Sequence, residues 1–257
     1  MSARFYADVA LKTGECISLP EQTARHVQVL RLQPGEHITL FNSRGDGQPG
    51  SEGEFDATVE RMGRSDVEIT IGVYTATARE AGRAIHLVVG MPANDRMDWL
   101  VEKATELGAA SIQPVMSERS VLRLKAERAD KKVAHWRGIA IAASEQCGRN
   151  RLLLIHEVAT LTDWLKRSMA ETSTDAGTRL LLSLQDGSRP LGQAAGSGAL
   201  TFLSGPEGGL SAAEEAAAIA CGFSPVTLGP RILRAETAPL ACLACLACLA
   251  QLALTVQ

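Results

Sequence analysis

The sequence predicts a two-part α/β protein, in which a small β-barrel precedes an α/β domain with a mostly parallel sheet. Within residues 1–75, stretches such as FDATVERM and SDVEITIGVY alternate apolar and polar side chains, as half-buried strands do. Beyond residue 83, nearly continuous apolar runs such as IHLVVGM alternate with helical segments, which is typical of buried parallel strands joined by helices. The stretch from Thr75 to Arg83 is polar, has no periodic apolar pattern and is the expected linker.

The individual elements follow from local signals. In the N-terminal region, EHITLF predicts a strand before a Gly/Asp turn, and a short helix is expected from Thr23 to Val29, ahead of the Pro34-Gly35 turn. In the C-terminal region the predicted strands are IHLVVGM, ASIQPVMS, RLLLIHEV, RLLLSLQ, ALTFLSG and SPVTLG. The predicted helices are RMDWLVEKATELG, the segment from Lys125 to Cys147, TLTDWLKRSMAE, SAAEEAAAIACG and the C-terminal segment from about Ala235.

The composition limits the class of protein. A chain of 257 residues with 46% apolar and 21% charged residues is ordinary for a globular protein, and a net charge of −3 argues against a uniformly basic nucleic-acid binder. The N-terminus has no apolar core of a signal peptide, so the six cysteines are expected to be free thiols in a reducing cytoplasm. The five histidines show no ligand spacing, so no metal site is expected.

A glycine-rich turn, SGPEGGLSAAE, joins a predicted strand to a predicted helix. Ser211 and Glu214 form a capping box, which makes Ser211 the expected N-cap. The glycines before it therefore lie at the carboxyl end of a strand, where open α/β sheets bind ligands. No Lys-Ser/Thr pair follows to grip a triphosphate, and the spacing does not fit the dinucleotide motif. Taken alone, this segment is better explained as a tight strand–helix turn that needs positive φ.

A second turn, VTLGPRILRAETA, strengthens the case for a ligand site. It places Arg231, Arg234 and Glu236 after another predicted strand, just before the C-terminal helix. Burying a charged group at such a position costs free energy unless the group is paired with an opposite charge or binds a ligand. An exposed Arg–Glu pair is the alternative. Because two Gly-Pro loops follow successive strands, we expect them to form adjacent walls of one pocket.

Four segments together resemble the RsmE family of ribosomal RNA uridine-N3 methyltransferases: GPEGGLSAAE, LGPRILRAETA, EKATELGAASIQPVMSERS and IAIAASEQCGRNR. That family belongs to the SPOUT superfamily, and ARHVQVLRLQPGE is similar to the start of its PUA-like β-barrel. The resemblance covers nearly the whole chain. It implies a PUA-like β-barrel RNA-binding domain over residues 1–75 and a SPOUT methyltransferase domain over residues 76–257, tied in a C-terminal trefoil knot.

The resemblance also implies a function. It predicts a cytoplasmic homodimer that uses S-adenosyl-L-methionine to methylate N3 of a uridine in the decoding-region helix of 16S rRNA in the small ribosomal subunit. This cofactor carries a sulfonium and no phosphate, which suits glycine loops without a phosphate-gripping lysine. The residues expected to bind it are Leu203, Ser204, Gly205, Glu207, Gly209, Leu228, Gly229 and Leu233. Glu207 is expected to hydrogen-bond the ribose, lie near the sulfonium, or orient the loop.

Catalysis and RNA binding are assigned to charged residues near these loops. Arg234 is expected to stabilise negative charge on the uracil carbonyls, while Glu236 or solvent accepts the N3 proton. From Arg119 to Arg151 the chain carries nine basic and three acidic residues, a net charge of +6. A solvated helix face is the usual meaning of such a run, but beside a methyltransferase pocket it favours a phosphate-binding surface. The predicted RNA contacts are Arg25, Arg31, Arg119, Arg123, Arg149 and Arg151.

The segment LACLACLACLAQLAL places cysteines at positions 242, 245 and 248. The spacing is that of an iron–sulfur run, but only Ala and Leu intervene, so a closely packed buried helix is expected. Three other functions compete with the family assignment. The chain could act on another RNA or another atom, serve as a non-catalytic RNA-binding assembly factor, or be a nicotinamide oxidoreductase, for which the sequence lacks the glycine fingerprint and its acidic partner.

Overall fold

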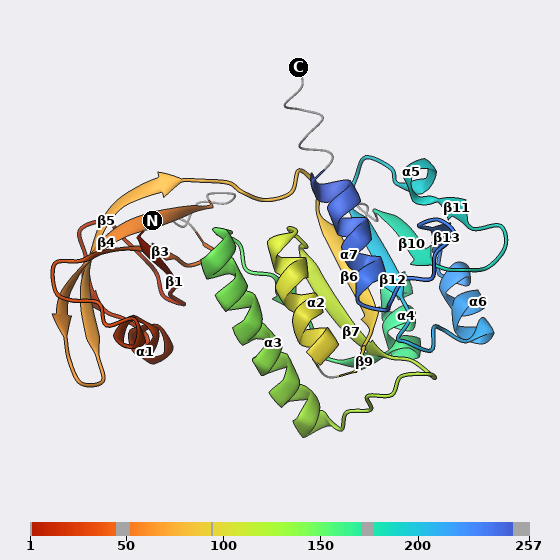
Figure 1. Ribbon diagram of the computed structural model, residues 1–257, viewed down its shortest axis with the longest axis horizontal. Helices are drawn as coiled ribbons and strands as arrows, with labels where there is room; N and C mark the ends of the chain where they lie inside the picture. The colour runs from red at the N-terminus through yellow and green to blue at the C-terminus, as the bar shows by residue number, and fades with distance from the viewer. Residues whose placement is uncertain (1, 45–51, 94, 171–176, 249–257) are drawn as a thin grey trace, which may run out of the picture. The chain divides into compact units, whose positions relative to one another are not determined.

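The structure is a computed structural model that describes residues 2–44, 52–93, 95–170 and 177–248 (Figure 1). The chain divides into two compact units. Unit 1 comprises Met1–Glu80 and Ile141–Leu152, and unit 2 comprises Ala81–Ala140 and Leu153–Gln257. The long helix α3 (Ala126–Cys147) therefore contributes residues to both units.

Unit 1 is built on a five-stranded sheet with the order β1-β3-β4-β5-β2. Its elements are β1 (Ala3–Tyr6), β2 (Cys16–Ser18), α1 (Glu21–Val29), β3 (His37–Phe41), β4 (Gly53–Met62) and β5 (Val67–Ala76). β1 pairs with β3 in parallel, and the other pairs are antiparallel. The predicted alternation is confirmed in β4, where Phe55, Ala57 and Val59 are buried in the core of this unit. The predicted short helix is confirmed as α1, which begins two residues earlier.

The end of α3 is held to the sheet of unit 1 by hydrogen bonds. Gly148 follows the helix with φ +86°, and its N–H donates to Ser144 O at 3.1 Å, so the helix ends at Cys147, as predicted. Arg79 donates to Gly148 O at 2.9 Å, so a cation binds the carbonyl that directly follows the helix. Glu145 accepts from the Tyr6 N–H at 3.0 Å.

Unit 2 contains the predicted parallel sheet. Its strands have the order β11-β13-β10-β12-β6-β7-β8, β9 also pairs with β7, and all pairs are parallel. The strands are β6 (Ile85–Gly90), β7 (Ser111–Met116), β8 (Leu154–Ile155), β9 (Ala159–Thr160), β10 (Thr178–Leu182), β11 (Arg189–Pro190), β12 (Leu200–Ser204) and β13 (Ser224–Thr227). The connecting helices are α2 (Asp95–Glu106), α3, α4 (Leu161–Ala170), α5 (Leu191–Ala194), α6 (Ala212–Ala220) and α7 (Thr237–Leu243).

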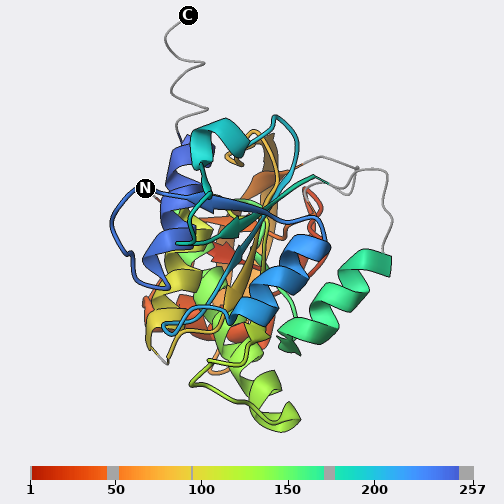
Figure 2. The same cartoon turned by 90° about the vertical axis from the view of Figure 1, so that its right-hand side faces the viewer.

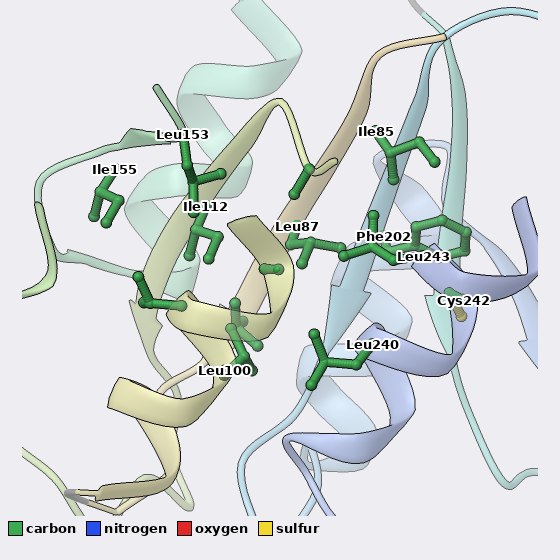
Figure 3. Close-up of a cluster of buried hydrophobic side chains, with 14 of the residues drawn as sticks. Ile85, Leu87, Leu100, Ile112, Leu153, Ile155, Phe202, Leu240, Cys242 and Leu243 are labelled. Atoms are coloured by element: carbon green, nitrogen blue, oxygen red, sulfur yellow. The ribbon is translucent and has the colours of Figure 1, made fainter. Parts of the chain in front are cut away.

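Helices cover both faces of this sheet, as its apolar strands require. On one face α2, α3 and α7 pack over side chains such as Leu87, Ile112 and Phe202. Figure 3 shows Leu100 of α2 and Leu240 of α7 directed at this cluster. On the other face α4 and α6, which lie side by side in Figure 2, pack over the alternate residues of the strands. The alternation of Leu87 and Val88 between the two clusters follows from the period of two in a strand.

Two predicted elements differ from the structure. RLLLIHEV forms only the two-residue strand β8, because its first residues belong to unit 1, where Leu152 N–H donates to Ser43 Oγ. The helix expected from about Ala235 begins at Thr237, and it changes after Leu243 into a π-helical turn, Ala244–Cys248. The rest of the cysteine-containing segment, residues 249–257, lies outside the described residues, as does the Gly/Asp turn expected after β3. None of the described helices is both long and apolar enough to cross a bilayer.

The buried ion pair of Arg149 and Glu80 in unit 1 leads to a stability prediction. The Arg149 side chain is 3% exposed, and its guanidinium donates to the Glu80 carboxylate at 2.5–3.1 Å. Removing one member of a buried pair leaves the other charge uncompensated. Glu80→Gln should therefore lower the free energy of unfolding by about 3 kcal/mol in urea titrations. The control is Glu21→Gln at the exposed pair of Glu21 with Arg25, which should cost less than about 1 kcal/mol. Equal losses in the two variants would contradict this assignment.

Candidate active site

A cavity of about 590 Å³ lies at the carboxyl ends of β10, β12 and β13. Its walls are the loop after β12, the loop after β13 and the end of β10. This is the edge of an open parallel sheet at which ligands bind, and the volume is within the range of small-molecule sites. The two glycine loops of the sequence therefore line one cavity, as expected.

The conformation of the loop after β12 is determined by a closely packed glycine, Gly205, and by the capping box at the start of α6. A side chain at Gly205 would place its Cβ 2.7 Å from the backbone of Gly209 and Leu210, so only glycine fits there. The Ser211 hydroxyl accepts from the Glu214 N–H at 3.2 Å, and the Glu214 carboxylate accepts from the Ser211 N–H at 2.9 Å. The predicted capping box is confirmed, and it fixes the point at which the loop ends and α6 begins.

The Glu207 carboxylate fastens this loop to the segment that follows β6. It accepts hydrogen bonds from the Ala93 N–H at 3.0 Å and from Arg96 at 3.1 Å. Burial alone would raise the pKa of Glu207, but these donors outweigh burial, and the pKa lies below its ordinary value. Of the roles expected for Glu207, the observed contacts are those of a group that orients the loop.

A second carboxylate fastens the same loop to the segment that follows β7. Glu214 accepts from the Glu118 N–H at 2.8 Å, in addition to its bond within the capping box. Beside it, Arg119 donates to Gly208 O at 3.0 Å. Three loops at the carboxyl edge of the sheet are thus joined through the glycine-rich turn, which is held from both sides.

The loop after β13 turns at Gly229, whose φ is +101°. The Gly229 N–H donates to Thr227 Oγ1 at 3.2 Å, so the strand's last side chain stabilises the turn. Arg234 O accepts from the N–H groups of Thr237 and Ala238 at 3.0 and 3.1 Å, which starts α7 and leaves the Arg234 side chain exposed at the cavity. Glu236 is only 6% exposed and is not among the lining residues.

The residues predicted to bind the cofactor gather at this cavity with one exception. Leu203 is fully buried and packs in the cluster beneath α4 and α6, so its side chain does not reach the cavity. The others line the walls together with Arg234: Ser204, Gly205, Glu207, Gly209, Leu228, Gly229 and Leu233. The Ser204 hydroxyl is buried and has no hydrogen-bond partner among the described residues, although Ser204 lines the cavity.

The residues predicted to bind RNA are in several settings. Arg119 lines the cavity, and Arg123 is exposed on the same segment, where it donates to Glu118 O. Arg25 and Arg31 are exposed in unit 1, as is Arg151, which pairs with Glu52. Arg149 is different, because its guanidinium is buried against Glu80, and this burial speaks against a contact with a phosphate.

Sequence reasoning missed several cavity residues, among them Arg96, Ser183 and Glu215. Arg96 lies in the first turn of α2 and contributes to a group of four arginines around the cavity, the others being Arg119, Arg231 and Arg234. Ser183, which follows β10, and Glu215, in the first turn of α6, also line the cavity. Arg96 could have been found by the same rule as the others, because it follows the carboxyl end of a predicted strand. No sequence signal pairs Ser183 with Glu215.

A second hollow of about 1140 Å³ lies beside α4, toward the start of β6, β10 and β12. His86 lines it and bonds Ser111 Oγ at 2.7 Å, and burial lowers the pKa of His86, with a further contribution from nearby His156. Its place at the amino ends of these strands is not the ligand end of an α/β sheet. Within the described ranges, no group of three or more His, Cys, Asp or Glu side chains is placed to hold a metal ion.

The fold and the site define a class of protein, which comparison with known proteins identifies as the RNA methyltransferases. The family model of the RNA methyltransferase domain matches residues 79–247. Ribosomal RNA small subunit methyltransferase E of Bacillus subtilis is 31% identical over 233 residues, which cover 86% of this chain and 84% of that protein. The corresponding protein of the Buchnera aphidicola strain from Schizaphis graminum is 29% identical over 240 residues, covering 93% and 92%.

Solved structures agree with these sequence matches. The structure of ribosomal RNA small subunit methyltransferase E from Neisseria gonorrhoeae, bound to S-adenosyl methionine, is similar with a TM-score of 0.87 and 37% identity, over 97% of this chain and 98% of that one. A Legionella pneumophila protein in complex with the same cofactor has a TM-score of 0.87 and 30% identity over the same shares. The chain belongs to the ribosomal RNA small subunit methyltransferase E (RsmE) family, and it is a methyltransferase.

The hydrogen bonds that Glu207 accepts from Ala93 and Arg96 predict how stability depends on pH. Because its pKa is lowered in the folded state, ionised Glu207 stabilises the fold above the unfolded pKa of about 4.3, and this contribution disappears as the pH falls through the lowered value. Glu207→Gln should lose about 1 kcal/mol of unfolding free energy at pH 7, and this loss should shrink as the pH falls through the lowered pKa of Glu207 in the folded protein. Urea titrations of both proteins at several pH values check this, and a loss that is the same at every pH would contradict it.

Proposed function

We propose that this protein uses S-adenosyl-L-methionine to methylate N3 of one uridine in the decoding-region helix of 16S rRNA. The observation that carries the proposal is the cavity between the two glycine loops, in a chain of the RsmE family. The cofactor is supported by the bound S-adenosyl methionine in the Neisseria gonorrhoeae relative. The base and the atom rest on the family resemblance of the sequence motifs.

The residues at the cavity suit this cofactor. No lysine is among the lining residues, and a Cβ at Gly209 or Gly229 would meet no atom within 4 Å, so a ligand can approach the backbone closely at these two glycines. The buried Ser204 hydroxyl, without a partner among the described residues, offers one further polar contact. We assign cofactor binding to the predicted set, with backbone groups at Leu203, Ser204, Gly205, Gly209, Leu228, Gly229 and Leu233, and we give Glu207 the role of holding the loop.

The chemistry requires that uridine N3 lose its proton and face the methyl donor in line. Bound S-adenosyl-L-methionine supplies an electrophilic methyl group on its sulfonium. Arg234, exposed at the cavity, is the proposed partner of the uracil carbonyl oxygens, on which negative charge develops. The predicted acceptor of the N3 proton is either Glu236 or solvent. Because Glu236 is buried, we favour solvent. The base reaches the cavity by leaving its helix.

The RNA is proposed to bind through phosphate contacts. Four arginines around the cavity supply positive charge where the target strand must approach. We assign further contacts to Arg123, Arg25, Arg31 and Arg151, all exposed, and none to the buried Arg149. Residues 1–75 are the proposed PUA-like β-barrel RNA-binding domain, and residues 76–257 are the proposed SPOUT domain with its trefoil knot. The proposed assembly is a cytoplasmic homodimer.

The test of the function is to map the methyl group. The protein is incubated with labelled S-adenosyl-L-methionine and with either 30S subunits or free 16S rRNA from a strain that lacks the modification. The expected product is a single N3-methyluridine in the decoding-region helix. A methyl group on another atom or on another RNA would contradict the proposed target and identify a different one. No transfer, together with no cofactor binding in calorimetry, would instead identify a non-catalytic RNA-binding factor.

If Arg234 stabilises charge on the uracil, its removal should slow methyl transfer without changing the affinity for the cofactor. Arg234→Ala should lower the rate of methyl transfer by about 100-fold, because charge on the uracil carbonyl loses its donor, while the dissociation constant for the cofactor changes little. Single-turnover kinetics and calorimetry measure the two quantities separately. Normal turnover would exclude the role, and loss of cofactor binding alone would make Arg234 a binding residue.

A further inference from the structure

Two carboxylates line the cavity, and their surroundings differ. Glu207 is committed to the protein, because it accepts from the Ala93 N–H and forms an ion pair with Arg96 at 3.1 Å. Glu215 forms no ion pair with any described residue, although four arginines line the same cavity. Its recorded side-chain contact is a hydrogen bond from the Ser183 hydroxyl at 3.1 Å. Glu215 is therefore the cavity carboxylate with spare capacity to accept hydrogen bonds.

The position of this carboxylate is fixed from two sides. Glu215 lies in the first turn of α6, whose start is set by the capping box at Ser211. Ser183 follows the last residue of β10 and is 6% exposed, and its hydroxyl accepts from the Gln185 N–H at 3.1 Å while donating to Glu215. Because the hydroxyl has one proton, its direction is settled by these two bonds. The remaining lone pairs of the Glu215 carboxylate are left for another donor.

A half-buried carboxylate at a cavity wall is favourable only when donors satisfy it. The ligand proposed for this cavity has two kinds of strong donor, an α-ammonium group at its methionine end and the hydroxyl groups of its ribose. We propose that Glu215 binds a hydrogen-bond donor of the methyl-donor cofactor and is a specificity-determining residue of this site, an inference that rests on the proposed function. Ser183 positions the carboxylate and does not itself need to touch the ligand.

A purely structural role for Glu215 makes a different prediction. An acidic residue in the first turn of a helix stabilises that helix by interacting with its positive end. In that case, removing its charge would lower the stability of the protein without changing its affinity for ligands. Thermal stability and affinity must therefore be measured on the same variants.

The experiment uses the full chain with Glu215→Gln, Glu215→Ala and Ser183→Ala. The control is Glu157→Gln, which makes the same charge change in unit 2 at an exposed residue that lines the second hollow instead. Calorimetry measures binding of S-adenosylmethionine, S-adenosylhomocysteine and methylthioadenosine. The last compound keeps the adenosine portion and lacks the amino-acid end. Thermal unfolding without ligand is recorded for each protein.

The expected result is that Glu215→Ala weakens S-adenosylmethionine binding by about tenfold, Glu215→Gln and Ser183→Ala weaken it by less, and Glu157→Gln has no effect. A loss for the two compounds with an ammonium group, but not for methylthioadenosine, assigns the donor to the methionine end. A loss for all three assigns it to the ribose. Unchanged affinities with a lowered melting temperature would overturn the inference and leave Glu215 a structural residue. Wild-type protein that binds none of the three would contradict the proposed function itself.

Discussion

The site depends on one constraint: the glycine-rich turn after β12 must keep its shape without the support of a bulky side chain. Glycine is required at position 205, because a Cβ there would collide with the backbone four residues later. Such a turn is flexible in isolation, and the chain compensates with two carboxylates. Glu207 and Glu214 accept from the N–H groups of Ala93 and Glu118, so the turn is fixed to the loops that follow β6 and β7.

This arrangement explains why the ligand site can be built largely from backbone. Polar groups of the main chain are fixed at the carboxyl edge of a sheet whose two faces are sealed by helices. The charged side chains at the cavity then divide into two sets. Glu207 holds the loop and Glu215 lines the cavity, while four arginines surround it, where we propose that the negatively charged RNA strand binds.

Much of the fold could be predicted from the sequence, because its signals are local. The alternating strands of unit 1, the apolar strands of unit 2 and the capping box at Ser211 are all periodic or short-range patterns, and each is confirmed. The contacts of Glu207 could not be predicted, since its partners lie more than a hundred residues away in the chain. The burial of Arg149 was missed for the same reason: its partner Glu80 is 69 positions distant, and an arginine after a helix is ordinarily exposed.

We propose that the two glycine loops form a single site for the methyl donor. A crystal structure of this protein with S-adenosylmethionine bound would test this site. Electron density for the cofactor is expected between the turn at Gly205 and the turn at Gly229, with the ligand against backbone groups of both loops. Density for an ordered cofactor elsewhere, for example in the hollow beside α4, would contradict it.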